Sequence, residues 1–357
     1  MWALDYRPKT FNDLIGQEHV VKVLSTILTR STLPAGFIFS GTRGTGKTTT
    51  ARIIAAALNC KKPNPNIIGS CGQCDPCKSV ELSNCTFVHE IDAASNNSVD
   101  SIRELKTRAL YHHEGNYRVF ILDECHSLTN QAFEALLKQL EEPPPQTLFV
   151  LATTDPDAVP DTVMSRLMQF DFKRLTVDLI ALRLQQIASI EKISIQDSRI
   201  FQAIAQKSNG AMRDAIMSLE QLSSYKEGLT VQDFYEYYGL VDGSVYGVLM
   251  DCARNANVLD ARKIIENNFS RGVDIGYFMD HFMRSIGGDV VNRRLSDAQA
   301  VEIYRGCVEV KSKLKYMSSD VAMSYLFMLL LRVFHQDRVG TAKAAPATID
   351  DLKALLS

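Results

Sequence analysis

The sequence contains 357 residues, of which 46% are hydrophobic and 22% are charged. This length and composition accommodate two or three globular domains. No apolar run approaches the roughly 20 residues of a membrane-spanning helix, and the N-terminus has no apolar signal-peptide stretch, so we expect a soluble cytoplasmic protein without membrane contact. The formal net charge of −2 gives no global attraction to nucleic acid, so any such contact must be local.

Short apolar strands alternate with helical segments over the first half of the chain. The alternation predicts an α/β domain over residues 1–174, with a parallel sheet covered by helices on both faces. The predicted strands are residues 36–40, 86–91, 117–123 and 147–154.

Only helical periodicity remains from about residue 175 onward. It predicts a small helical domain over residues 175–240 and a second all-α domain over 241–340. The Ala/Pro-containing segment 341–357 predicts a flexible tail, with a docking peptide as the alternative.

A glycine-rich motif, GTRGTGKT, follows the first predicted strand and matches GxxxxGK[ST] in full. A helical run follows it, which is the context that the motif requires, and this context disfavours a chance glycine-rich turn. Backbone N–H groups of such a loop bind phosphate oxygens, while Lys47 contacts the β and γ phosphates of ATP and Thr48 gives a hydroxyl to Mg²⁺. The predicted nucleotide-binding residues here are Gly41, Thr42, Arg43, Gly44, Thr45, Gly46, Lys47, Thr48 and Thr49.

Two carboxylates end the third predicted strand, at the sheet edge where open α/β sheets bind ligands. We expect Asp123 to hold Mg²⁺ together with Thr48, and Glu124 to polarise the attacking water. Thr154 ends the next strand, where its hydroxyl is placed to sense the γ phosphate. An ordinary β-branched strand residue is the alternative for Thr154.

Four cysteines are clustered between the glycine-rich motif and the second predicted strand. Cys60, Cys71, Cys74 and Cys77 supply enough thiolates for a closed tetrahedral Zn²⁺ site with a structural role. A redox loop and a metal-cluster site remain as alternatives.

These motifs occur in an order that resembles the gamma/tau ATPase of bacterial replicative clamp loaders, a family of AAA+ proteins. The segments that carry the resemblance are RPKTFNDLIGQEHVV, GTRGTGKTTTARIIAAALNC, CGQCDPC, EIDAASNN, ILDECH, ALLKQLEEPP and LATTDP. The resemblance is close over about the first 220 residues and extends to the rest only in helical character.

The resemblance implies a motor of DNA polymerase III that loads a sliding clamp onto primer-template DNA by hydrolysing ATP at subunit interfaces. Its partners would be other clamp-loader subunits in a pentameric hetero-oligomer, with residues 175–240 as lid and 241–340 as oligomerisation collar. Arg166 resembles the arginine that completes a neighbouring subunit's site in trans, and Arg213 the lid arginine that contacts the γ phosphate. The adenine side would involve Tyr6, Arg7, Pro8 and the segment from Ile15 to Val20.

Contacts with DNA are implied at two places, residues 92–105 and 136–143. Asn96, Asn97 and Ser98 stand at a predicted helix start, where backbone amides can bind phosphate, and Lys138 lies in the second segment. The family often has a basic residue where Asn96 stands, and a helix start without a ligand is the alternative.

Two other functions compete with a clamp-loader motor. One is another AAA+ remodeller, such as a Holliday-junction or origin-loading ATPase, against which the cysteine insert and the helical third domain argue. The other is a structural subunit that does not hydrolyse ATP, which would need none of the residues Lys47, Thr48, Asp123, Glu124 and Arg213.

Overall fold

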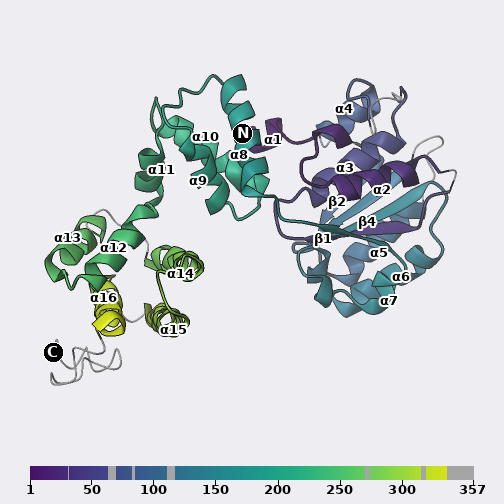
Figure 1. The fold of residues 1–357 in the computed structure, drawn as a ribbon. Helices are drawn as coiled ribbons and strands as arrows, with labels where there is room; N and C mark the ends of the chain where they lie inside the picture. The colour runs from purple at the N-terminus through teal and green to yellow at the C-terminus, as the bar shows by residue number, and fades with distance from the viewer. Residues whose placement is uncertain are drawn as a thin grey trace. The chain divides into compact units, whose positions relative to one another are not determined.

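The computed structural model describes residues 1–30, 32–62, 70–82, 85–110, 117–269, 273, 275–314 and 319–335. The segment 341–357, predicted as a tail, lies outside these residues. The chain divides into two compact units, Met1–Gly228 and Leu229–Ser357 (Figure 1). Among the helices of the described part, none is long and apolar enough to cross a membrane.

A five-stranded parallel sheet, in the order β2-β3-β4-β1-β5, forms the centre of the first unit. This confirms the predicted α/β class. The sequence did not predict β5, a short edge strand in which only Phe170 and Phe172 are buried. The strands are β1 (Gly36–Gly41), β2 (Val88–Asp92), β3 (Arg118–Asp123), β4 (Thr147–Thr153) and β5 (Met168–Phe172).

Helices cover both faces of this sheet because alternate strand residues point in opposite directions. On β3, Val119 and Ile121 pack in one core with α2 and α3, whereas Phe120 and Leu122 pack in another with α5, α6 and α7 (Figure 1). Three further helices, α8 to α10, form a lid within the same unit. The helices of the first unit are α1 (Trp2–Asp5), α2 (Glu18–Leu28), α3 (Lys47–Leu58), α4 (Asp75–Glu81), α5 (Val99–Leu110), α6 (Asn130–Glu141), α7 (Asp161–Met164), α8 (Val177–Ile190), α9 (Arg199–Lys207) and α10 (Met212–Tyr225).

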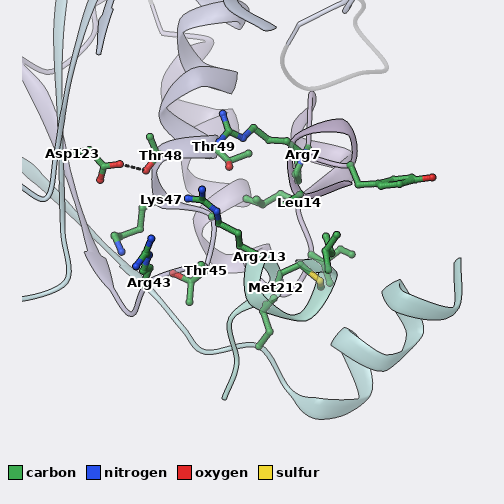
Figure 2. A pocket seen from close by; sticks show the side chains of 18 of the residues that line it. Arg7, Leu14, Arg43, Thr45, Lys47, Thr48, Thr49, Asp123, Met212 and Arg213 are labelled. Atoms are coloured by element: carbon green, nitrogen blue, oxygen red, sulfur yellow. Dashed lines mark hydrogen bonds between the residues drawn. The ribbon is translucent and has the colours of Figure 1, made fainter. Parts of the chain in front are cut away.

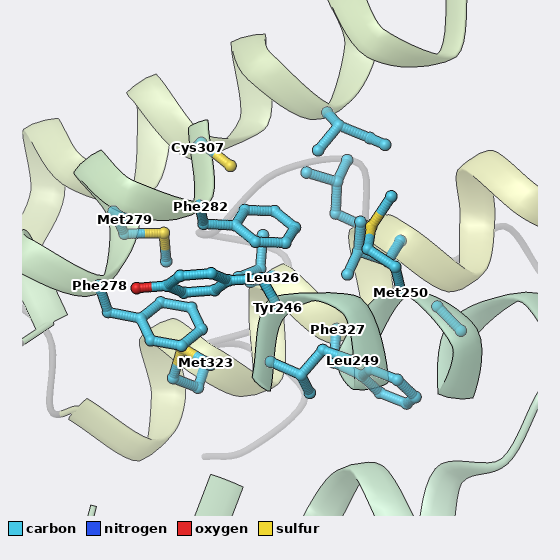
Figure 3. Packing of buried hydrophobic residues seen from close by; sticks show 14 of the residues in the cluster. Tyr246, Leu249, Met250, Phe278, Met279, Phe282, Cys307, Met323, Leu326 and Phe327 are labelled. Atoms are coloured by element: carbon cyan, nitrogen blue, oxygen red, sulfur yellow. The ribbon is translucent and has the colours of Figure 1, made fainter. Parts of the chain in front are cut away.

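The second unit is helical throughout its described residues. Tyr246 packs edge-on against Phe278 and near Phe282 in an apolar core that the later helices share (Figure 3). Capping boxes at Thr230 and Ser296 fix the starts of α11 and α15. The helices are α11 (Val231–Tyr238), α12 (Ser244–Arg254), α13 (Val258–Phe269), α14 (Ile275–Val291), α15 (Asp297–Lys313) and α16 (Ser319–His335).

Candidate nucleotide site

The predicted phosphate-binding and acidic residues meet because their strands are neighbours. In the sheet, β4 lies between β3 and β1, so the carboxyl ends of the three strands share one edge. A cavity of about 440 Å³ opens there (Figure 2). It is lined by Ala3, Tyr6, Arg7, Pro8, Asp13, Leu14, Ile15, Arg43, Gly44, Thr45, Gly46, Lys47, Thr48, Thr49, Asp92, Ala94, Asp123, Glu124, Leu175, Arg183, Met212, Arg213 and Ile216.

The glycine-rich loop turns sharply into the N-terminus of α3. Gly44 and Gly46 have φ values of +78° and +105°, a region that favours glycine. The Lys47 ammonium donates hydrogen bonds to the carbonyl oxygens of Gly41 at 2.7 Å and Thr42 at 3.1 Å. Gly41 and Thr42 thus meet the lysine through their backbone and are not among the residues lining the cavity.

Burial dominates the electrostatics of Lys47. The residue is only 6% exposed, and desolvation lowers the pKa of its ammonium group, while the carboxylates of Glu124 and Asp123 oppose this shift. A cation kept out of water binds a polyanion more strongly than an exposed one. The loop is therefore suited to triphosphate.

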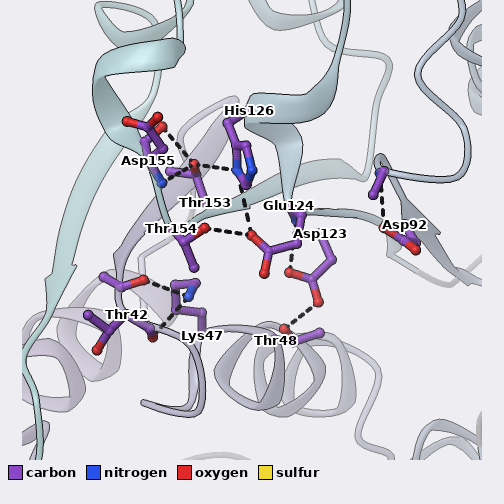
Figure 4. Close-up of polar contacts among 12 residues, drawn as sticks. Thr42, Lys47, Thr48, Asp92, Asp123, Glu124, His126, Thr153, Thr154 and Asp155 are labelled. Carbon is purple, nitrogen blue, oxygen red and sulfur yellow. Dashed lines mark hydrogen bonds and ion pairs between the residues drawn. The ribbon is translucent and has the colours of Figure 1, made fainter. Parts of the chain in front are cut away.

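The two carboxylates have different partners. Asp123 Oδ2 accepts a hydrogen bond from Thr48 Oγ1 at 2.7 Å, whereas Glu124 Oε2 accepts one from Thr154 Oγ1 at 3.0 Å (Figure 4). Glu124 has a left-handed φ of +48°, and its own amide donates to Asp123 Oδ1 at 3.0 Å. This backbone turn points the two neighbouring carboxylates in different directions. The Asp123 carboxylate contacts Thr48 at the start of α3, and the Glu124 carboxylate contacts Thr154 just after β4.

His126 is a neighbour of this pair that the sequence did not indicate. Its Nδ1 lies 3.5 Å from Glu124 Oε2 and 3.2 Å from Thr153 Oγ1 (Figure 4). Asp92, at the end of β2, and Met212, on the lid, also line the cavity without having been predicted. For Asp92 the signal was available, because it too ends a parallel strand.

The lid contacts the glycine-rich loop directly. The amide of Met212 donates to the Gly44 carbonyl at 3.1 Å, and a Cβ on Gly44 would lie 2.8 Å from that of Ala211. Arg213, the next lid residue, lines the cavity beside Lys47 (Figure 2). Arg213 of the lid is therefore placed to contact a ligand bound at the glycine-rich loop.

The N-terminal segment forms another wall of the cavity. Tyr6, Arg7 and Pro8, which the sequence predicted on the adenine side, line this cavity together with Ile15. Val20 is 1% exposed in the core around α2 and is not among the lining residues. The Tyr6 hydroxyl donates to Glu191 of the lid, which raises the pKa of Tyr6 to about 12.

Arg166 and the predicted DNA contacts lie outside the lining of this cavity. Arg166 follows α7 and forms an exposed ion pair with Glu141 at 2.6 Å. Three exposed residues, Asn96, Asn97 and Ser98, precede α5. Ser98 Oγ accepts a hydrogen bond from the backbone amide of Ser101 at 3.3 Å. Lys138 is exposed on α6.

The four clustered cysteines come together in space. The Sγ atoms of Cys60, Cys71, Cys74 and Cys77 all lie within 4.8 Å of one another. Sulfur atoms on a tetrahedral zinc ion are about 3.8 Å apart, given Zn–S bonds of about 2.3 Å, and the distances from Cys77 Sγ are 3.3 Å to Cys74 and 3.9 Å to Cys71. Amides of Gln73 and Cys74 lower the pKa of Cys71 to about 6. The cluster therefore fits a zinc ion.

A P-loop, an acidic pair and a helical lid on one five-stranded parallel sheet define an ATPase of the AAA+ class. Residues 16–176 match the family model described as DNA polymerase III, delta subunit, and residues 182–224 match the RCF1/5-like AAA+ ATPase lid domain. The chain belongs to the DNA polymerase III gamma/tau family. It is 35% identical over 274 residues to DNA polymerase III subunit gamma of Buchnera aphidicola, a match that covers 76% of this chain and 75% of that protein.

A second relative shows how much of a longer protein this chain represents. DNA polymerase III subunit gamma/tau of Mycoplasma genitalium is 39% identical over 278 residues, which cover 77% of this chain and 46% of that protein. The chain thus matches about half the length of that relative. Among solved structures, the Thermotoga maritima RuvB Holliday junction branch migration motor aligns with a TM-score of 0.50 and 20% identity over 69% of this chain and 79% of that one. At this identity the likeness shows a shared fold alone.

Proposed function

We propose that this chain is an ATP-driven motor subunit of a replicative clamp loader, which opens a sliding clamp and loads it onto primer-template DNA. The observation that carries the proposal is the joining of Lys47, Asp123, Glu124 and Arg213 in one cavity, in a chain of the gamma/tau family. A subunit that only supports its partners would need no such set of residues.

In the proposed reaction each residue has a separate task. Lys47 and the loop amides bind the phosphates of ATP, and Thr48 and Asp123 are the residues that would hold Mg²⁺, which neutralises phosphate charge. Glu124 orients and polarises the attacking water, and Thr154 keeps its carboxylate in place through their hydrogen bond at 3.0 Å. Arg213 would contact the γ phosphate in its own subunit.

We further propose that hydrolysis depends on the assembly. Arg166 is exposed and would exchange its ion pair with Glu141 for contact with the nucleotide of a neighbouring subunit in a pentameric hetero-oligomer. Residues 241–340 would form the collar and residues 175–240 the lid. The amides and side chains of Asn96, Asn97 and Ser98, with Lys138, are candidates for contact with the phosphates of primer-template DNA. The replication role of the relatives favours a cytoplasmic location.

A loading assay tests this function. The protein is assembled with its copurifying subunits, and a labelled sliding clamp is incubated with primed circular DNA and ATP. We expect clamp to stay on the DNA after gel filtration with ATP, and not with Lys47→Ala, because the substitution removes the cation that binds the phosphates. The proposal would be contradicted if the wild-type protein retained clamp on unprimed DNA but not on primed DNA, or retained no clamp on either DNA.

A further inference from the structure

The N-terminal segment that lines the nucleotide cavity is a thin wall between two cavities. Arg7 and Pro8 line the nucleotide cavity, and the same residues line a second cavity of about 330 Å³. The opposite side of this second cavity is formed by α3 and by the cysteine insert, which contributes Ser70, Cys77 and other residues. The insert therefore lies behind the wall that faces the nucleotide.

Two polar contacts join the insert to this wall. Ser70 Oγ donates a hydrogen bond to the Lys9 carbonyl at 3.1 Å, and Ser70 is 3% exposed. The Lys9 ammonium also pairs with Glu81 of α4 at 2.5 Å, but both side chains are well exposed. Exposed ion pairs contribute little, whereas a buried hydroxyl such as that of Ser70 has little access to water and depends on its protein acceptor, so the Ser70 contact is the stronger constraint.

The insert is itself fixed to α3, the helix that begins at the P-loop. Cys60 closely follows the end of α3, and Val80 of α4 packs in a small core with Ala56 of α3 and Phe87. The four sulfur atoms come from both ends of the insert and lie within 4.8 Å of one another, so a zinc ion bound to them would join these ends. A continuous set of contacts thus runs from the P-loop through α3 and the insert to Lys9, next to Pro8.

We propose that the cysteine insert positions the adenine-side wall of the nucleotide cavity, with Ser70 as the positioning residue. This inference rests on the proposed ATP binding and gives the insert a function in it. Ser70 does not touch the nucleotide. It fixes the backbone at Lys9 and so keeps Tyr6, Arg7 and Pro8 against the cavity before ATP arrives, which lowers the entropy lost on binding.

The test compares Ser70→Ala with Ser79→Ala. Ser79 lies on α4 of the same insert, but its hydroxyl donates to Pro76 within that helix at 2.9 Å, so its loss leaves the wall untouched. We expect Ser70→Ala to raise the Kd of a fluorescent ATP analogue by up to about tenfold and to leave kcat at saturating ATP unchanged. Amide hydrogen exchange over residues 4–9 should speed up in Ser70→Ala and remain unchanged in Ser79→Ala.

Removing zinc from the cysteine cluster of the wild-type protein with a zinc-selective chelator, in buffer with excess Mg²⁺, provides a second readout. It should speed exchange over residues 4–9 and raise the Kd as Ser70→Ala does, even if that variant folds poorly. Unchanged exchange in both experiments, faster exchange with unchanged Kd, or an equal effect of Ser79→Ala would overturn the proposal. Failure of the untreated wild-type protein to bind the analogue would instead refute the proposed nucleotide binding itself.

Discussion

Replacing Glu124 with glutamine is expected to lower the kcat of ATP hydrolysis by about 10²- to 10⁴-fold. Glutamine keeps the shape of the side chain and an acceptor for Thr154, but it cannot polarise water as a carboxylate does. In the proposed site Lys47 and the loop amides bind the phosphates instead, so the affinity for ATP should stay within about threefold of the wild-type value. Single-turnover hydrolysis and equilibrium binding measure the two effects separately.

The matched control for this variant is Glu134→Gln. Glu134 is an exposed carboxylate on α6 and is not among the residues lining the cavity, so the same substitution there should leave both kcat and Kd unchanged. A Glu124→Gln variant that hydrolyses ATP at more than about a tenth of the wild-type rate would exclude Glu124 as the residue that activates water. Loss of ATP binding would instead place it among the residues that hold Mg²⁺.

Arg166→Ala is the second substitution with a large expected effect. If the guanidinium completes a neighbour's site, hydrolysis by the assembled complex should fall by about 10³-fold or more, as for arginine fingers of other nucleotide hydrolases. The variant's own cavity is intact, so it should still bind ATP. A complex that mixes Arg166→Ala subunits with Glu124→Gln subunits should recover turnover. In such a complex a Glu124→Gln subunit supplies its Arg166 to the site of an Arg166→Ala neighbour, which retains Glu124.

The variant Glu141→Gln distinguishes a role of Arg166 in a neighbour's site from a role of its ion pair in local stability. It breaks the ion pair with Arg166, in which the side chains are 34% and 49% exposed, but it keeps the guanidinium. Exposed pairs of this kind contribute about 0–1 kcal/mol to stability, so we expect nearly normal turnover. Equal losses in Glu141→Gln and Arg166→Ala, or no recovery in the mixture, would show that Arg166 acts within its own subunit.

The strands of the sheet that position the site were predictable because apolar runs mark buried parallel strands. The strands β1, β3 and β4 appeared in the sequence in this way, whereas β2 was predicted as a buried strand although none of its residues is buried. The glycine-rich motif and the acidic pair could then be placed at one edge by the rule that parallel strands end together, and the cysteine spacing indicated a cluster that the structure confirms.

Other features depended on contacts that no local pattern encodes. The edge strand β5 has only two buried residues, Phe170 and Phe172, and so lacks a continuous apolar run. His126 lies next to Glu124 at a point where Glu124 has a left-handed backbone conformation. A glutamate in the sequence does not predict such a conformation. The hydrogen bond from Ser70 to Lys9 joins residues 61 positions apart. A single serine in the sequence does not indicate which distant residue its hydroxyl will contact.

ATP turnover by the protein assembled with its copurifying subunits, with and without a sliding clamp and primer-template DNA, shows whether this chain is a clamp-loading motor. We expect slow turnover by the protein complex alone and strong stimulation when clamp and primed DNA are both present. Turnover that is indifferent to both would contradict a clamp-loading function and leave an AAA+ ATPase with another substrate. No turnover under any condition would contradict the motor itself and favour a subunit that does not hydrolyse ATP.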